Sequence, residues 1–153
     1  MKEIRTEIDI QASPEKVWQV LTALDKYPEW NPFLHHASGK AEPGGKVDVT
    51  FKYGSKDMTL HCGVIKCEPN HEISWRYHMG LPFLYQGEHI FTIETSGNDK
   101  VHFIDREVFT GLLVSFMVNE KDNVGFKSMD QALKTRAEGD MSSVAEQIKR
   151  VLV

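Results

Sequence analysis

Residues 119–138, NEKDNVGFKSMDQALKTRAE, decide how the rest of the chain must fold. Four apolar residues recur in this stretch at helical spacing and share one side of an α-helix, namely Phe126, Met129, Leu133 and Ala137. Most polar residues between them, including Asp130, are expected on the remaining helix surface. Gly139 and Asp140 supply a stop signal. One amphipathic helix cannot bury its apolar stripe alone, so a broad second layer must cover it.

The chain before this helix has the pattern of strands joined by short turns. Residues 3–10 alternate between apolar and polar side chains, which predicts a first strand. Further strands are predicted at residues 34–40, 46–53, 58–68, 72–79, 83–95 and 101–109. Regular spacing with short turns is typical of an antiparallel meander. We therefore expect an α+β fold, with a curved antiparallel sheet of about seven strands laid against the long helix.

Short helical segments are predicted after the first strand and at the end of the chain. Ser13 and Pro14 begin the first one, because serine caps free amides and proline fits the first helical position. Pro28 and Pro32 allow at most a short second helix, so residues 27–33 form a bent scaffold like a lid or a cavity wall. A separate C-terminal helix is predicted from the capping box of Ser143 with Glu146 and from the spacing of Val144, Ile148 and Val151.

Composition excludes several classes of protein. The 153 residues fit one domain with one core, so residues 1–153 are predicted to form a single ligand-binding domain. The 41% hydrophobic and 26% charged residues exclude a disordered chain, and no apolar run approaches the roughly 18 residues of a membrane-spanning helix. A net charge of −4 with interspersed signs argues against a nucleic-acid partner. The first residues lack a signal peptide's apolar region, so a cytoplasmic location is expected.

Cysteines and histidines show no pattern of a metal or cofactor site. Cys62 and Cys67 lie on one predicted strand on the order of 16 Å apart, whereas a disulfide needs less than about 7 Å, so free thiols are expected. His35 and His36 point to opposite faces of a strand, and the other histidines are scattered. No metal and no cofactor is therefore expected. The motifs of serine hydrolases, nucleotide enzymes and dehydrogenases are missing as well.

Three groups of residues carry a family resemblance that spans nearly the whole chain. They read IQASPEKVW and LDKYPEWNPF at residues 10–18 and 24–33, GEHIF and REVFTG at residues 87–91 and 106–111, and GFKSMDQALKTRAE at residues 125–138. The chain resembles the polyketide cyclase/dehydrase and lipid-transport family of the START-like (SRPBCC) superfamily, and its order of elements is similar to the helix-grip fold. The resemblance implies a hydrophobic tunnel between sheet and long helix. Members bind lipids, polyketides, hormones or other apolar molecules, and some catalyse cyclisation or dehydration, so the family defines architecture better than activity.

Aromatic residues on the sheet face toward the helix are either ordinary core or the wall of a ligand cavity, and the resemblance favours the cavity. The residues expected to contact a ligand are Trp30, Phe33, Trp75, Tyr77, Phe83, Tyr85, His89, Phe91, Phe103, Glu107, Phe126, Met129 and Leu133. Trp75, Tyr77 and Tyr85 stand out because an indole NH or a phenol OH can orient a bound polar group.

His89, Asp105 and Glu107 interrupt the apolar alternation of two predicted strands. A three-residue turn places His89 opposite Glu107 and a two-residue turn places it opposite Asp105, and either register keeps all three on one face. A neighbouring carboxylate raises the basicity of a histidine and holds its tautomer, as in a general base. The alternative is a buried ion pair or a histidine bonded to water at the cavity edge. We predict that the three residues form the polar end of the pocket.

Three functions fit these features. The leading one is non-catalytic binding or carriage of a lipid-, polyketide- or aromatic-like apolar molecule. An enzyme of the cyclase or dehydratase type is the alternative, with His89 as acid/base and Asp105 or Glu107 as its orienting partner. A protein-interaction or chaperone-assisting module is the third, and it predicts a filled core with an exposed apolar patch. Residues 111–118 border the tunnel mouth in the family or form a homodimer contact, and the sequence leaves both open.

Overall fold

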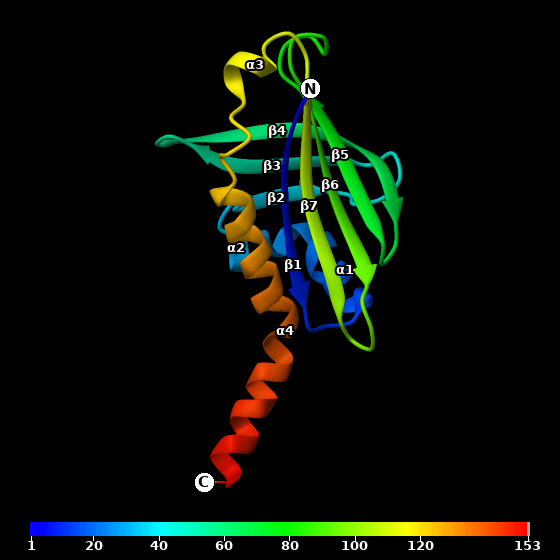
Figure 1. Ribbon diagram of the computed structural model, residues 1–153, viewed down its shortest axis with the longest axis vertical. Coiled ribbons are helices and arrows are strands. Elements are labelled where there is room, and N and C mark those ends of the chain that lie inside the picture. Colours follow the sequence, from blue (N-terminus) through cyan, green and yellow to red (C-terminus); the bar gives the residue numbers. More distant parts are fainter. Residues whose placement is uncertain (153) are drawn as a thin grey trace.

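A seven-stranded antiparallel sheet forms the body of the protein, as the computed structural model in Figure 1 shows. The structure describes residues 1–152, and of residues 140–150 it describes the backbone alone. The strands are β1 (Lys2–Ile10), β2 (His36–Gly39), β3 (Lys46–Tyr53), β4 (Lys56–Glu68), β5 (Glu72–His78), β6 (Gln86–Thr95) and β7 (Val101–Thr110). They lie in the order β1-β7-β6-β5-β4-β3-β2. The meander from β2 to β7 is thus extended by β1, which pairs with β7. The expected curved α+β sheet is confirmed.

Helices cover one side of this sheet. They are α1 (Pro14–Thr22), η1 (Leu24–Lys26), α2 (Tyr27–Trp30), α3 (Val114–Met117) and α4 (Val124–Leu152). Ser13 caps α1 as predicted, because its Oγ accepts a hydrogen bond from the Lys16 amide at 3.1 Å. In Figure 1, α4 passes along β1 and over α1 and α2, and its last turns extend beyond the sheet. The predicted pair of short helices and the predicted long helix are therefore both present.

The prediction that Gly139 ends the long helix is wrong. The α4 backbone continues without interruption to Leu152. A glycine ends a helix when it adopts a left-handed conformation, and Gly139 is not among the residues with positive φ. A separate last helix is therefore not formed. The capping box predicted for Ser143 and Glu146 concerns side chains that lie outside the described residues.

The core lies between the sheet and the first half of α4. Met129 and Leu133 of α4 are fully buried, as are Phe91 and Phe103 of the sheet. Cys62 and Cys67 both lie on β4 and are free thiols, as expected. None of the helices in the described part of the chain combines the length and the apolarity that a membrane crossing requires.

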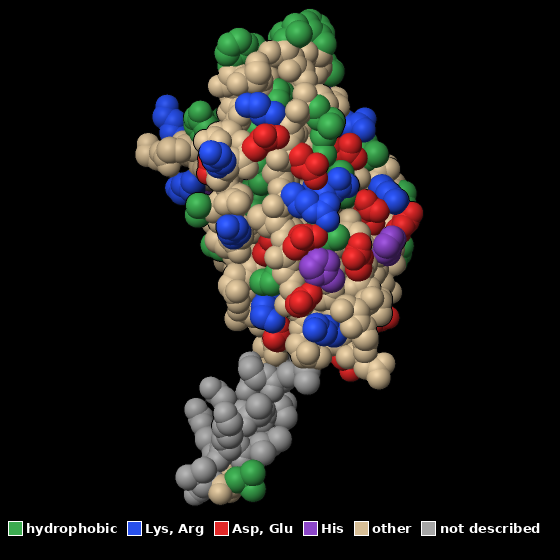
Figure 2. All heavy atoms as spheres, in the orientation of Figure 1, with side chains coloured by type: hydrophobic (Ala, Val, Ile, Leu, Met, Phe, Trp, Pro, Cys, Tyr) green, Lys and Arg blue, Asp and Glu red, His purple; other side chains and the backbone are tan. Residues whose placement is uncertain are grey.

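Exposed apolar side chains gather at the end of the molecule where α3 meets the β5–β6 connection (Figure 2). The most exposed are Phe116 at 86%, Leu112 at 70% and Phe83 at 60%. Two backbone hydrogen bonds, from Leu112 to Phe83 and from Leu113 to Leu84, hold the two segments together. This apolar end adjoins the opening of the cavity described next.

Candidate functional site

A cavity of about 500 Å³ lies between the inner face of the sheet and the start of α4. Strands β3 to β7 form its wall, Phe33 and Leu34 enter from the α2–β2 connection, and residues between α3 and α4 border its opening. Its volume and its mostly apolar lining are typical of sites that hold a small molecule. The strand alternation explains the wall, because every second side chain of each strand points to the same face.

Seven of the predicted ligand contacts line this cavity: Phe33, Trp75, Tyr77, Tyr85, His89, Glu107 and Phe126. Phe91, Phe103, Met129 and Leu133 do not, because each is 0% exposed in the solid core beneath it. They support the site indirectly. Phe91, for example, stacks on the His89 ring with centroids 4.1 Å apart.

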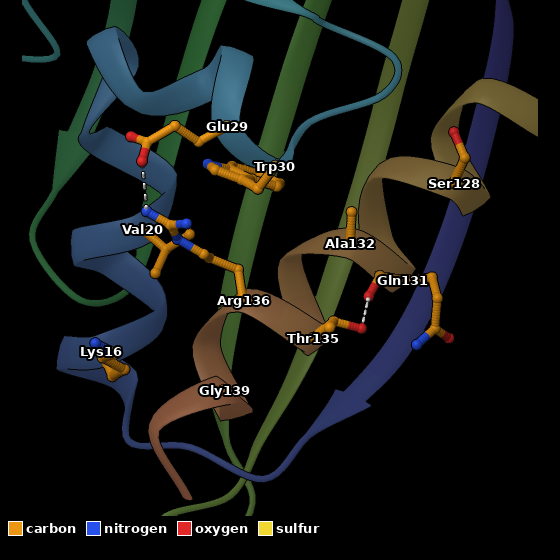
Figure 3. Close-up of a pocket in the computed structure, with 10 residues that line it drawn as sticks. All are labelled: Lys16, Val20, Glu29, Trp30, Ser128, Gln131, Ala132, Thr135, Arg136 and Gly139. Atoms are coloured by element: carbon orange, nitrogen blue, oxygen red, sulfur yellow. Dashed lines mark hydrogen bonds and ion pairs between the residues drawn. The ribbon is translucent and has the colours of Figure 1, made fainter. Parts of the chain in front are cut away.

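Phe83 and Trp30 lie elsewhere. Phe83 is exposed because β6 begins only at Gln86, so the expected strand from residue 83 is a turn over its first residues. Trp30 lines an open outer groove between α1, α2 and α4, shown in Figure 3. Six of the ten residues that line the groove are charged or polar, and the Arg136 guanidinium lies 3.6 Å from the Glu29 carboxylate across it. The groove is larger than the cavity but offers no enclosed apolar surface.

Several lining residues were missing from the predicted contacts. Val49, Phe51, Met58 and Leu60 line the cavity from β3 and β4, and their alternation was a usable signal. Met117 and Val118, the last two of residues 111–118, line the cavity. The homodimer contact stays a prediction.

The β6–β7 turn sets the position of the polar residues. The Ser96 amide bonds the Lys100 carbonyl at 2.9 Å across a three-residue turn, and His89 is therefore paired with Glu107. This is the first of the two registers considered above. The hydrogen bond of the histidine nevertheless goes diagonally to Asp105, with Nε2 2.6 Å from Oδ1. All three residues lie on one face and are buried.

Asp130 joins this cluster from α4, which corrects the expectation that it faces solvent. It is 2% exposed, and its Oδ2 accepts a hydrogen bond of 2.5 Å from the Thr6 hydroxyl. Asp130 follows Phe126 by four residues and precedes Leu133 by three, which is the spacing of the buried face. The position of Asp130 on the helix therefore predicted burial, whereas its charge suggested exposure to solvent.

Asp105 and Asp130 are two buried carboxyl groups in contact, and burial favours a proton on one of them. Burial raises the pKa of Asp105 to about 7 and that of Asp130 to about 8, and the two carboxyl groups are hydrogen-bonded to each other. Asp105 Oδ2 and Asp130 Oδ1 are buried and have no hydrogen-bond donor among the described residues, and a proton on Asp130 directed at Asp105 would satisfy both oxygens. Asp105 then remains the acceptor for the His89 N–H.

The basicity of His89 differs from the expectation. Burial lowers its pKa, and the charges of Glu107 and Asp130 only oppose that effect in part. The ring is therefore neutral at neutral pH. With Nε2 bonded to Asp105, the tautomer leaves Nδ1 as an unprotonated acceptor, and no described residue bonds to it.

Glu107 on β7 is held by a tyrosine of β5, across the intervening strand β6. The Tyr77 hydroxyl donates to Glu107 Oε1 at 2.6 Å, and burial raises the pKa of this carboxyl above its ordinary value. Gly87 permits this contact, because a Cβ at that residue would overlap the Tyr77 ring. The polar end of the cavity thus combines a neutral imidazole and a buried carboxyl group.

Comparison with known proteins agrees with this architecture. A family model described as polyketide cyclase / dehydrase and lipid transport matches residues 1–153. No curated protein matches the chain.

Several solved structures share the fold. Protein MLL2253 from Mesorhizobium loti is 20% identical with a TM-score of 0.71, over 90% of this chain and 97% of that one. A START superfamily protein from Mycobacterium smegmatis is 16% identical with a TM-score of 0.72, over 91% and 99%. Norcoclaurine synthase from Thalictrum flavum, in complex with dopamine and hydroxybenzaldehyde, is 16% identical with a TM-score of 0.66, over 88% and 84%. The chain therefore belongs to the polyketide cyclase/dehydrase and lipid-transport family and has its START-like helix-grip fold.

Proposed function

We propose that this protein binds a lipid-, polyketide- or aromatic-like small molecule in the cavity between the sheet and α4. The observation that supports this proposal is a cavity of about 500 Å³ whose wall is largely aromatic and aliphatic. An interaction module was expected to have a filled core and an exposed apolar patch. The exposed side chains at the α3 end agree with the patch, but the cavity does not agree with a filled core and favours a ligand. Carriage without chemistry is the simplest use of such a site.

Native extraction tests this proposal. The purified protein is extracted with organic solvent without prior unfolding, and the extract is analysed by mass spectrometry. Nile red, an uncharged apolar dye, is then titrated into the extracted protein. We expect one defined apolar molecule in the extract and saturable binding of one dye per chain. A clean extract together with no saturable dye binding would contradict the proposal.

One observation favours catalysis as a second candidate function. His89 is buried, neutral and held by Asp105, and its Nδ1 is free to accept a proton from a bound substrate. Asp105 would stabilise the imidazolium that forms, as expected of a general base and its partner. Norcoclaurine synthase shows that an enzyme can have this fold. Proton abstraction next to a carbonyl, a step in cyclisation and dehydration, is the reaction this arrangement supports.

Deuterium exchange tests the catalytic proposal. Benzoylacetone, a small 1,3-diketone, is incubated with the protein in deuterated buffer and followed by NMR. We expect faster exchange at the central carbon with the protein, and loss of the acceleration in His89→Gln with dye binding retained. An exchange rate equal to that in buffer alone would remove this candidate. A cytoplasmic location and a homodimer stay predictions.

A further inference from the structure

One hydroxyl donor at the polar end of the cavity is already used within the protein. The Tyr77 hydroxyl donates to Glu107 Oε1 at 2.6 Å, so its single proton is not available to a ligand.

Two acceptor atoms at this end of the cavity have no partner among the described residues. Glu107 Oε2 has no partner among the described residues, and it is not one of the fully enclosed polar atoms. Nδ1 of His89 also has no partner among the described residues and is not fully enclosed, while Nε2 of the same ring is bonded to Asp105. Both residues line the cavity, so two acceptor atoms face the space where a ligand would lie.

The cavity has no buried positive charge to receive an anion. Lys52 is the one lysine or arginine among the described lining residues, and its side chain is 64% exposed. It pairs at 3.2 Å with Asp57 on the neighbouring strand. A carboxylate at the polar end would lie beside Glu107 in a low-dielectric site without a counter-charge, which is unfavourable.

We infer that the cavity selects apolar ligands that carry a hydrogen-bond donor, such as a phenol, an alcohol or an amine, and rejects apolar carboxylates. This inference rests on the proposed ligand-binding function and narrows it to a chemical class. The donor of the ligand would bond to Glu107 or to Nδ1 of His89, and its apolar body would contact Trp75 and Phe126. A buried acceptor that a ligand leaves without a donor keeps its full desolvation cost, so a ligand that lacks a donor should bind more weakly.

Calorimetric titration of three naphthalenes at neutral pH tests the inference. The probes are 2-naphthol, which donates a hydrogen bond, 2-methoxynaphthalene, which only accepts one, and 2-naphthoate, which is anionic. We expect 2-naphthol to bind roughly tenfold more tightly than either of the others. This ranking is measured on the unmodified protein, so it does not depend on a variant that folds.

A variant pair locates the selectivity. Glu107→Gln keeps the shape of the side chain but replaces one carboxyl oxygen with an amide donor, so the gap in affinity between 2-naphthol and 2-naphthoate should narrow. Glu88→Gln makes the same change on the outer face of β6, where Glu88 lies 3.3 Å from Arg76, and should leave the gap unchanged. If 2-naphthoate binds the unmodified protein as tightly as 2-naphthol while Nile red still binds, the selectivity is overturned and the ligand-binding function stands. If neither the naphthalenes nor Nile red bind, both are overturned.

Discussion

Asp130 shows how one buried carboxyl group sets the protonation of its neighbours. Burial favours a proton on Asp130, and Asp105 therefore remains a hydrogen-bond acceptor. As an acceptor, Asp105 fixes the tautomer of His89. Thr6 completes the arrangement from β1. The histidine at the cavity is therefore oriented by residues from β1, β7 and α4, three segments that are distant in sequence.

This arrangement predicts a pH dependence of stability. Because burial raises the pKa values of Asp105 to about 7 and Asp130 to about 8, the folded protein binds protons that the unfolded chain releases near its ordinary pKa of 3.8. The free energy of unfolding contributed by these groups is thus highest below that value and falls as the pH rises through the raised values. Asp130→Asn mimics the protonated acid at every pH, since its amide donates to Asp105 in the same way. We expect this variant to lose less stability than the unmodified protein between about pH 5 and pH 9.

Urea denaturation at several pH values across this window gives the measurement. His89 has the opposite sign, because its lowered pKa costs stability as the pH falls, but it is present in both proteins and largely cancels in the comparison. Asp25→Asn, which makes the same change at an exposed residue, serves as the control. Equal pH slopes for the unmodified protein and Asp130→Asn would show that Asp130 holds no shared proton.

Helix α4 contains two glycines with different surroundings. A Cβ at Gly125 would lie 2.5 Å from Cδ1 of Phe33, whereas a Cβ at Gly139 meets no described atom within 4 Å. The Phe33 ring packs on Phe126 with centroids 5.1 Å apart and lines the cavity. Gly125 therefore permits the close approach of the helix start to the cavity wall, and Gly139 has no comparable role among the described contacts.

The two glycines predict opposite effects of the same substitution. Gly139→Ala should raise the free energy of unfolding by about 1 kcal/mol, because alanine is the better helix former. Gly125→Ala gains the same propensity but displaces Phe33, so we expect a net loss of stability and weaker Nile red binding. Thermal melts and dye titrations of both variants provide the test. Stabilisation by Gly125→Ala with unchanged dye binding would show that Phe33 is not fixed by this contact.

The elements of this fold were largely predictable from local patterns. Alternation identified the strands, and the N-cap at Ser13 fixed the start of α1. The errors came from features that local patterns do not contain. Gly139 resembles a helix end in the sequence, yet a glycine ends a helix only when its φ is positive, and the φ of Gly139 is not. Asp130 resembles a surface residue, yet its partners Thr6 and Asp105 lie on β1 and β7.

At the scale of the whole molecule, alternation predicts which face a side chain takes but not what covers it. Phe91 and Phe103 lie along the inner face beneath α4 and are solid core, whereas Tyr77 and Tyr85 lie toward α3, where α4 has not yet begun, and line the cavity. The division between core and cavity follows from where the long helix crosses the sheet. Long-range packing sets where the helix crosses the sheet. The sequence therefore predicted which residues point to the inner face, but not which of them line the cavity.

A cavity that exists because the helix spans a curved sheet should disappear when its wall is filled. Leu60→Trp adds an indole to the inner face of β4, inside the cavity, and Ile65→Trp adds one to the same strand at a residue that is 50% exposed and outside the lining. A ligand at a hundredfold excess over its Kd stabilises the folded protein by about 2.7 kcal/mol and therefore raises its melting temperature. We expect Leu60→Trp to lose both Nile red binding and this rise in melting temperature. Ile65→Trp should keep both. Circular dichroism verifies that the two variants fold alike, so equal dye binding by both would place the ligand outside this cavity.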